Sequence, residues 1–418
     1  MAGMNPLLSR LQPYPFERLR QLFAGVQPNP AYAPISLGIG EPRHPTPAFL
    51  KDTLCQAIQS PDGGLANYPA TGGTPALKQA CATWLARRYG LEVDANSQIL
   101  PVNGSREALF ALAQVVVDPR AFAQGEEPVV VCPNPFYQIY EGAAYLSGAQ
   151  PWFAPSDPQR NFATDWASVP HEIWARTQLV YTCSPGNPTG AVMPLEEWAQ
   201  LFELSDRYGF VIASDECYSE IYFRDEPPLG GLQAAHRLGR TDFRRLISLT
   251  SLSKRSNVPG LRSGFVAGDA ALIRDFLLYR TYHGSAMSTT VQAASAAAWL
   301  DEDHVRDNRE QYRAKFAAVT PLLAAAMDVR LPDAGFYLWA GVPTHFGGQD
   351  HSGHPQRDTV FARELYAQYN VTVLPGSYLA REAQGHNPGR HRVRMALVAE
   401  TAECVEAARR IVRFIQSA

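Results

Sequence analysis

Short apolar segments alternate with helical segments along much of this 418-residue chain, and this alternation limits the folds open to it. The segments expected to form strands are Pro128–Cys132, Leu179–Thr182, Phe210–Ser214, Leu246–Thr250 and Ser263–Ala267. The segments with helical periodicity are Ala48–Gln59, Thr74–Tyr89, Ser105–Val117, Tyr137–Ser147 and Leu195–Tyr208. Strands that alternate with helices pair in parallel, and the helices cover both faces of the sheet. The pattern therefore predicts an α/β fold with a mainly parallel sheet flanked by helices.

A different pattern follows and predicts a smaller α+β domain. Thr289–Met327 is a long helical stretch, expected to connect the two domains. After it we expect a strand pair, a helix, two further strands and a terminal helix, at Val329–Leu331 with Phe336–Ala340, Asp358–Tyr369, Val371–Leu374, Val393–Leu397 and Thr401–Ile415. The first 45 residues are Pro-rich, with a short helix near Pro15–Phe23. The expected division is an N-terminal arm or small-domain segment (1–45), a large domain (46–290), and a connecting helix with a small C-terminal domain (291–418).

Composition argues against several classes of protein. The net charge is −3 and the pI about 6.4, so nothing indicates a nucleic-acid or membrane-surface partner. Six cysteines are scattered without a CxxC pair, which is typical of reduced thiols in a cytoplasmic enzyme. The N-terminus is interrupted early by prolines and does not resemble a signal peptide. The apolar stretches are too short to span a bilayer. We therefore expect a cytoplasmic protein.

Polar or aromatic side chains follow three of the predicted strands. Asp215 follows FVIAS, and a carboxylate there could pair with a protonated pyridine nitrogen or simply cap a helix. Tyr218 lies three residues further on. Asn187, in SPGNPTG, could donate to the phenolic oxygen of the same ring, although NPTG alone is an ordinary turn. Tyr137 could stack on a flat ring or pack in the core.

Other motifs have the residues that bind phosphate and carboxylate. In NGSREAL, Gly104, Ser105 and Arg106 lie at a strand-to-helix junction, where free N–H groups and the helix dipole favour phosphate. Tyr68 lies in a Gly-rich loop before a helix. Arg394 lies in a predicted apolar strand, where a substrate carboxylate would explain an arginine better than an edge position does.

The string SLSKRSNVPGLRSGF holds one of only four lysines in the chain. Lys254 lies among serines, and a Pro-Gly turn and Arg262 follow it. The amine can form a Schiff base with an aldehyde. The guanidinium and the hydroxyls of Ser251 and Ser253 can hold phosphate oxygens. The string therefore suits a phosphate-bearing aldehyde cofactor, whereas an exposed loop lysine is the plainer alternative.

In this order, the motifs resemble those of class I and II aminotransferases with the fold-type-I pyridoxal-phosphate fold. The motifs are LGIGEP, YPATGG, NGSREAL, SPGNPTG, SDECYSEIYF, SLSKRSNVPGLRSGF, GFYLWA and VRMAL. The resemblance runs from about residue 30 to the end of the chain. It implies a seven-stranded type of sheet in the large domain, pyridoxal 5'-phosphate as cofactor, amino-acid and 2-oxo-acid substrates, and a homodimer with shared active sites.

Carried over residue by residue, the resemblance also implies roles. Lys254 would bind the cofactor aldehyde and then act as the base that moves the substrate proton. Asp215 would pair with the pyridine nitrogen, and Tyr218 and Asn187 would hold the phenolic oxygen. The remaining residues expected around the ring and phosphate are Tyr137, Gly104, Ser105, Arg106, Ser251, Ser253, Arg262 and, from the neighbouring subunit, Tyr68.

A finer resemblance is to the succinyldiaminopimelate transaminase branch. The runs that carry it are NPLLSRLQPYPFERLRQLF, ISLGIGEPRHPTP and SLSKRSNVPGLRSGFVAGD. It implies transfer of an amino group between glutamate and N-succinyl-LL-diaminopimelate, in diaminopimelate and lysine biosynthesis. Gly40 and Arg394 would hold the α-carboxylate. Both substrates also carry a distal carboxylate, so a further arginine is expected. Arg43 is the candidate, with Arg20 and Arg280 as others.

Other functions stay open at this point. The chain could be another aminotransferase, for aspartate, acetylornithine, kynurenine or aromatic substrates, or a pyridoxal-phosphate lyase acting on β-C–S bonds. A ligand-sensing regulator would need a DNA-binding segment, and the first 45 residues are too Pro-rich for one. His345, His351 and His354 lack a cysteine or carboxylate cluster, so residues 345–357 are expected to be a surface loop and no metal site is expected.

Overall fold

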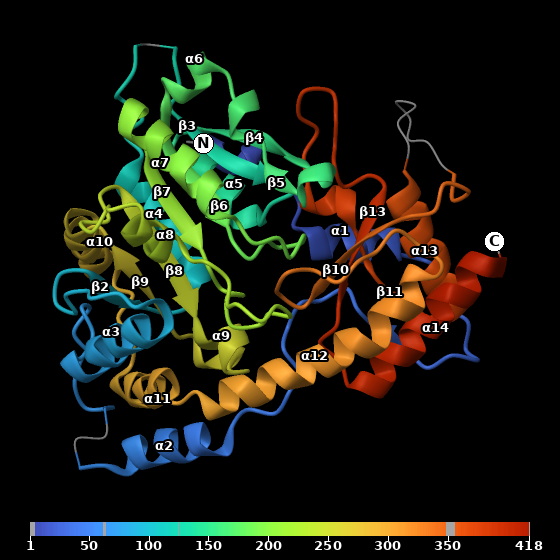
Figure 1. Ribbon diagram of the computed structural model, residues 1–418, viewed down its shortest axis with the longest axis horizontal. Helices are drawn as coiled ribbons and strands as arrows, with labels where there is room; N and C mark the ends of the chain where they lie inside the picture. The colour runs from blue at the N-terminus through green and yellow to red at the C-terminus, as the bar shows by residue number, and fades with distance from the viewer. Residues whose placement is uncertain (1–4, 62–63, 124, 348–355, 418) are drawn as a thin grey trace.

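An eight-stranded sheet forms the centre of the larger part of the molecule (Figure 1). The computed structural model describes residues 5–61, 64–123, 125–347 and 356–417. The strand order is β2-β9-β8-β7-β6-β3-β4-β5. The strands are β2 (Ile99–Val102), β3 (Val129–Asn134), β4 (Gln150–Asp157), β5 (Ala163–Thr164), β6 (Thr177–Cys183), β7 (Val211–Asp215), β8 (Leu246–Ser251) and β9 (Gly264–Gly268). Strands β8, β7, β6, β3 and β4 pair in parallel, and the outer strands β9, β2 and β5 are antiparallel. The predicted mainly parallel sheet is confirmed.

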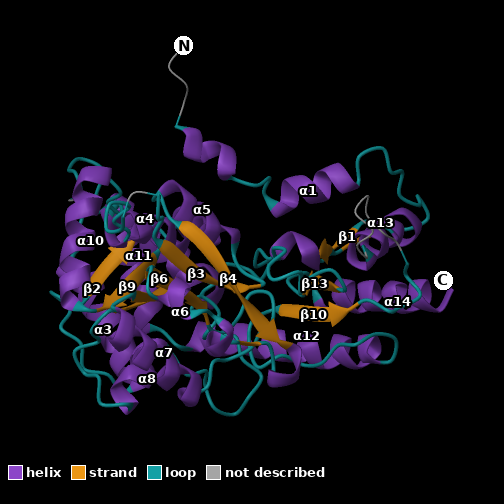
Figure 2. Ribbon diagram, turned by 90° about the horizontal axis from the view of Figure 1, so that it is seen from above, coloured by secondary structure: helices purple, strands orange, loops and turns teal. Residues whose placement is uncertain are grey.

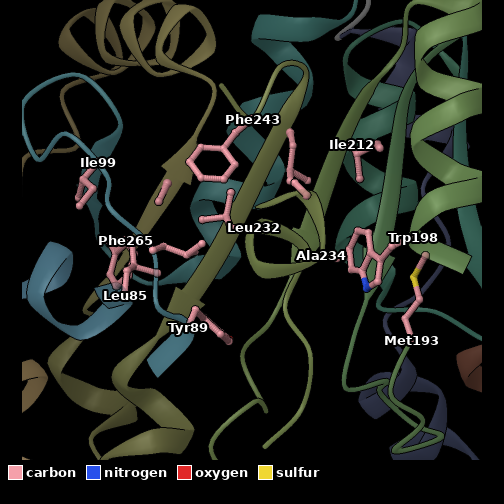
Figure 3. Close-up of a cluster of buried hydrophobic side chains, with 14 of the residues drawn as sticks. Leu85, Tyr89, Ile99, Met193, Trp198, Ile212, Leu232, Ala234, Phe243 and Phe265 are labelled. Carbon is pink, nitrogen blue, oxygen red and sulfur yellow. The ribbon is translucent and has the colours of Figure 1, made fainter. Parts of the chain in front are cut away.

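Each face of the sheet packs against its own layer of helices. Successive strand residues point to opposite faces, so Ile212 packs in one hydrophobic cluster and Ala213 in another. The first cluster, which includes Leu85, Trp198 and Phe265, is shown in Figure 3. The helices that supply residues to it are α2 (Ala48–Gln59), α3 (Pro75–Tyr89), α6 (His171–Trp174), α7 (Leu195–Tyr208), α8 (Gly231–Arg237), α9 (Leu252–Arg255) and α11 (Thr289–Leu300). The second cluster packs against α4 (Ser105–Val116), α5 (Gln138–Leu146) and α10 (Ala270–His283).

The long helix α12 (Asp303–Ala324), drawn in orange in Figure 1, leads from the larger part of the molecule into a smaller part. Its three-stranded sheet has the order β10-β13-β12, with β10 (Tyr337–Gly341), β13 (Arg392–Ala396) and β12 (Leu374–Pro375). A second pair joins β1 (Ile35–Ser36) to β11 (Val371–Thr372), so the N-terminal segment packs with C-terminal elements. The helices here are α1 (Pro15–Leu22), α13 (Arg357–Tyr369) and α14 (Thr401–Ser417), seen from above in Figure 2. The expected domain limits at residues 45 and 290 stay a prediction.

Four sequence expectations were wrong or incomplete. The helical stretch 289–327 is two helices, because Asp301 takes an extended conformation between α11 and α12. Val329–Leu331 is not a strand, and β10 pairs with β13 instead. Strands β2 and β4 were missed because both contain proline, which usually indicates an edge or a loop. Helix α10 was also not expected.

No helix within the described residues is long and apolar enough to cross a membrane.

Candidate active site

A cavity of about 530 Å³ lies at the carboxyl ends of the parallel strands, against residues of the smaller sheet. It brings together most of the residues that the sequence singled out. These are Gly40, Ser105, Arg106, Tyr137, Asn187, Asp215, Tyr218, Ser253, Lys254, Arg262 and Arg394. Parallel strands end at the same edge of a sheet, so segments far apart in the sequence meet there.

Lys254 projects into this cavity from α9, directly after β8. The Ser251 hydroxyl caps α9 by accepting from the Ser253 N–H at 3.1 Å. The Lys254 Nζ lies 5.9 Å from the centre of the Tyr218 ring. Among the described residues the amine has no hydrogen-bond partner, so it is available to a ligand in the cavity. Ser251 does not line the cavity and supports the lysine through the helix cap.

Asp215 ends β7 and is almost fully buried. Its Oδ2 accepts from the Tyr140 hydroxyl at 2.8 Å, and its Oδ1 from the Cys217 N–H at 3.3 Å. Burial raises the pKa of this carboxyl, and the bonds from Cys217 and Tyr140 and the charge of Lys254 act in the opposite direction. A buried carboxylate that faces the cavity can hold a protonated ring nitrogen.

The amino end of α4 forms one side of the cavity. Gly104 is the N-cap and lacks a side chain, so no side chain occupies the free N–H groups of the first turn. The Arg262 guanidinium covers Gly104, and a Cβ there would collide with it. Ser105 and Ser253 add hydroxyls at the same place. Helix N–H groups, a guanidinium and hydroxyls together match the donors that bind phosphate. Gly104 itself does not line the cavity.

Arg394 lies on the opposite side, on β13, and is 3% exposed. Its two terminal nitrogens donate to Asn187 Oδ1 at 3.1 Å and to the Gly38 carbonyl at 2.9 Å. The guanidinium stacks 4.3 Å from the centre of the Tyr337 ring, and its Nε has no partner within the described residues. A buried cation with unused donors is costly unless an anion joins it. The arrangement suits a substrate carboxylate.

Arg106 lies at the exposed end of the cavity. Its Nε donates to the Tyr137 hydroxyl at 2.7 Å, and a terminal nitrogen donates to the Tyr14 hydroxyl at 3.4 Å. Two phenols thus hold the guanidinium, and among the described residues it makes no hydrogen bond to Ser253. The phosphate contact expected for Arg106 stays a prediction.

Several expected residues are not brought to this cavity. Tyr68 is fully exposed, so it does not contact the site of its own chain. Arg43 pairs with Glu403 at 3.6 Å and does not line the cavity. Of the other candidates for a distal carboxylate, Arg20 pairs with Glu17 in solvent, and Arg280 is buried against Glu107. None of the three arginines reaches the substrate side of the cavity.

The sequence reasoning missed three residues that support this cavity. Tyr140 bonds to Asp215, and Cys217 contacts the Ser105 hydroxyl at 2.9 Å. Tyr337 bonds through its hydroxyl to that of Tyr218 at 3.0 Å. The motif GFYLWA contained Tyr337, but nothing in the sequence places this strand next to Tyr218.

Within the described ranges, no group of three or more histidine, cysteine or carboxylate residues is placed to hold a metal ion. His351 and His354 lie outside the described residues.

Comparison with known proteins places this site in a family. The model of the family "Aminotransferase class I and II" matches residues 33–411. The chain is 31% identical over 406 residues to the LL-diaminopimelate aminotransferase of Desulforudis audaxviator, covering 97% of this chain and 96% of that one. It is similar to the crystal structure of an aminotransferase from Neisseria meningitidis, with 53% identity and a TM-score of 0.91 over 98% of this chain and 100% of that one.

A further solved structure is a probable N-succinyldiaminopimelate aminotransferase from Thermus thermophilus. The TM-score is 0.81, with 24% identity over 96% of this chain and 99% of that chain. At this identity the likeness concerns the fold alone.

Gly40 gives the first test of the site. A Cβ at Gly40 would lie 2.7 Å from ring carbons of Tyr337. The guanidinium of Arg394 stacks on that same ring. We expect Gly40→Ala to displace that ring and raise KM for the amino-acid substrate by about tenfold, since overpacking costs about 1–3 kcal/mol. Cofactor absorbance should be retained. Gly347→Ala, where a Cβ meets open space, is the control. An unchanged KM in Gly40→Ala would contradict the assigned contact.

Proposed function

Because the chain belongs to the class I and II aminotransferases, we propose that it interconverts N-succinyl-LL-diaminopimelate plus 2-oxoglutarate with N-succinyl-2-amino-6-oxopimelate plus glutamate. Members of this family use pyridoxal phosphate, act on amino acids and 2-oxo acids, and are typically dimers. The reaction would serve diaminopimelate and lysine biosynthesis. The family assignment is a finding, whereas the pair of substrates is our proposal.

The residues of the cavity fit pyridoxal 5'-phosphate. The open first turn of α4, Ser253 and Arg262 would hold the phosphate, and Asp215 would hold the pyridine nitrogen. The Asn187 Oδ1 accepts from Arg394, which leaves its Nδ2 free to donate to the phenolic oxygen. When bound, the cofactor supplies a cationic ring that withdraws electrons from the substrate Cα.

Lys254 is the residue proposed to move the proton. Its amine is free of protein partners among the described residues, and it approaches the Tyr218 side of the cavity. An amine that is released from the cofactor beside the substrate Cα can take that proton as a general base. Arg394 would orient the substrate through its α-carboxylate, and Gly40 leaves space for that group beside Tyr337.

Two arginines that both line the cavity, each with different hydrogen-bond partners, are the observation that carries the substrate proposal. Arg394 is buried and suits the α-carboxylate. Arg106 also lines the cavity and is exposed, with two phenol hydroxyls and no carboxylate as side-chain partners in the described part of the chain. A substrate with carboxylates at both ends would use both cations. Glutamate and N-succinyl-LL-diaminopimelate share that property.

The relatives support a diaminopimelate-type substrate. Several, at 28% to 31% identity, are LL-diaminopimelate aminotransferases, and the substrate in that name lacks the succinyl group. The succinyl group is therefore the point that an experiment must decide.

The deciding experiment is a spectrophotometric half-reaction. The cofactor-loaded protein is mixed separately with N-succinyl-LL-diaminopimelate, LL-diaminopimelate, glutamate, aspartate or cystathionine. We expect rapid loss of the yellow absorbance with the succinylated substrate and with glutamate. Lys254→Ala, the control, should lose the yellow absorbance altogether.

Each other outcome of this experiment contradicts the proposal in a defined way. Reaction with LL-diaminopimelate but not its succinyl derivative would assign the unsuccinylated substrate. Reaction with glutamate but neither diaminopimelate compound would leave only the family assignment. Release of pyruvate from cystathionine would indicate a lyase.

Arg106→Ala tests the distal contact. Loss of a charge-assisted bond should raise KM for both dicarboxylate substrates by about tenfold or more, because such a bond contributes about 1.5–3 kcal/mol. We expect the visible absorbance to be retained, because Ser105, Ser253, Arg262 and the backbone N–H groups of α4 remain to hold the phosphate. Arg43→Ala is the comparison variant. If KM rises in Arg43→Ala and not in Arg106→Ala, Arg43 binds the distal carboxylate and the assignment to Arg106 is wrong.

We also propose that Tyr68 completes the site of a second subunit. Its side chain is fully exposed, and Leu65, Leu278 and Tyr282 nearby in the loop and on α10 are 76%, 61% and 88% exposed. Large apolar side chains that gather at a surface in this way indicate a subunit interface. The family is typically dimeric, and the loop of Tyr68 would then reach the partner.

Mixed dimers test this proposal. A Lys254→Ala chain is paired with a Tyr68→Phe chain, so that only the second chain can bind the cofactor covalently. If Tyr68 serves the partner, that single site has an intact tyrosine, and its affinity for pyridoxal phosphate should equal the wild-type affinity. An affinity about tenfold weaker, like that expected for the Tyr68→Phe homodimer, would place Tyr68 in its own chain's site.

A further inference from the structure

A buried chain of polar side chains lies behind Lys254, outside the cavity. It consists of Lys315, His44 and Asn308, which are 1%, 7% and 2% exposed. The Lys315 Nζ lies 2.9 Å from His44 Nε2, and His44 Nδ1 lies 2.8 Å from Asn308 Oδ1. The Asn308 Nδ2 lies 3.1 Å from the carbonyl oxygen of Lys254 and 3.4 Å from that of Arg255. The proposed mechanism uses none of these three side chains.

The direction of every bond in this chain follows from chemistry. Backbone carbonyls only accept, so the Asn308 amide nitrogen must face Lys254 and its oxygen must face His44. The His44 Nδ1 must therefore carry the proton, which leaves Nε2 as the acceptor for Lys315. Burial lowers the pKa of His44, in agreement with a neutral ring that donates at one nitrogen and accepts at the other.

A lysine such as Lys315 is unusual as the buried last member of this series of hydrogen-bonded side chains. No carboxylate is hydrogen-bonded to its amine among the described residues, and Glu400 and Glu403 act on its pKa only from a distance. Burial lowers that pKa. An amine placed this way costs folding free energy, and a role in orienting His44 would account for it.

The chain of bonds links three parts of the site. Asn308 and Lys315 lie on one face of α12, two turns of helix apart. His44 lies two residues after Pro42, the last residue of the segment Ile39–Pro42, which lines the substrate side of the cavity. At the other end, α9 has only four residues, and Asn308 provides a partner for its last carbonyls.

Asn257 and Thr46 reinforce the same link. The Asn257 Nδ2 donates to Asn308 Oδ1 at 2.9 Å, so that oxygen accepts two bonds. The Thr46 hydroxyl donates to the Asn257 carbonyl at 3.2 Å. The segment that holds His44 and Thr46 is thus joined to the loop after Lys254 directly through Thr46 and indirectly through Asn308 of α12.

We infer that Asn308, His44 and Lys315 are positioning residues that hold the backbone of Lys254 in a set place relative to the substrate-binding segment Ile39–Pro42. The inference rests on the proposed role of Lys254, and only the rate measurement below also depends on glutamate as the amino donor. Hydrogen bonds in series polarise one another, so loss of one member should weaken the others. The function of the chain is to keep the amine aligned with the substrate Cα, where small displacements reduce the rate strongly.

Asn308→Ala and His44→Ala test the inference in the cofactor-loaded protein. We expect the rate constant of the half-reaction at saturating L-glutamate to fall about tenfold in Asn308→Ala, with KM changed less than about twofold. The midpoint of the pH titration of the visible absorbance should shift by about half a pH unit or more. His44→Asn, which keeps a donor, should recover part of the loss seen in His44→Ala.

Asn387→Ala is the matched control, because among the described residues the only hydrogen bond of this buried side-chain amide is the one that it accepts from the Gly389 N–H in its own turn. It should leave both the rate constant and the titration midpoint at wild-type values. If Asn308→Ala and His44→Ala also leave them there, the inference is wrong. If Asn308→Ala does not fold, Lys315→Met with His44→Asn gives the same two readouts.

A second measurement separates the inference from the role of Lys254. The full-length apoprotein is treated with pyridoxal, which lacks the phosphate, and cyanoborohydride, and the labelled peptide is identified by mass spectrometry. We expect Lys254 to be labelled in both proteins, at rates that differ at least threefold between Asn308→Ala and the wild type. If Lys254 is labelled at the same rate in Asn308→Ala and in the wild-type protein, the positioning role is wrong and the role of Lys254 is unaffected. Absence of label on Lys254 in the wild-type protein would overturn the role of Lys254.

Discussion

Parallel pairing of β6, β7 and β8 is the constraint on which the rest of the site depends. In their register Cys183 lies opposite Asp215, and Asp215 lies opposite Leu249. The segments that leave these strands therefore begin side by side. They carry Asn187, Asp215 and Lys254, and their spacing is set by the separation of neighbouring strands. Because the strands are buried on both faces, a slip in register would move their whole apolar pattern.

Charges with few protein partners give the cavity its chemistry. Arg394 is buried with an unused Nε, and Asp215 is buried with two neutral donors. Each is a costly arrangement in an empty site and a favourable one when an oppositely charged ligand joins it. The larger sheet supplies the carboxylate and the smaller sheet supplies the guanidinium. A ligand held by both charges would lie where the two parts of the molecule meet.

Hydrogen bonds from neighbouring segments hold the short helix that contains Lys254. The lysine is on a four-residue helix, which has few bonds of its own. Ser251 caps its start, and Asn308 of α12 holds its last carbonyls. A short helix held from both ends lets the side chain move while its backbone stays in place. The long helix α12 therefore has a part in the site besides connecting the two sheets.

The sequence by itself determined the sheet type, the family, and the residues that follow each strand. Apolar segments and the polar residues at their ends depend on local periodicity, which can be read from the chain. Proline hid β2 and β4, since its missing N–H is compatible with both an edge strand and a loop. The choice of Arg43 as the distal contact rested on its position in the chain alone, and the structure pairs it with Glu403.

Only the tertiary structure decided which distant groups meet. Tyr337 reaches Tyr218, and Lys315 reaches His44 across 271 positions of the chain. No periodicity records such contacts, because they depend on how α12 and the smaller sheet pack against the larger one. The sequence specifies strands and helices through local preference, whereas partners for buried polar groups are chosen only when the layers come together.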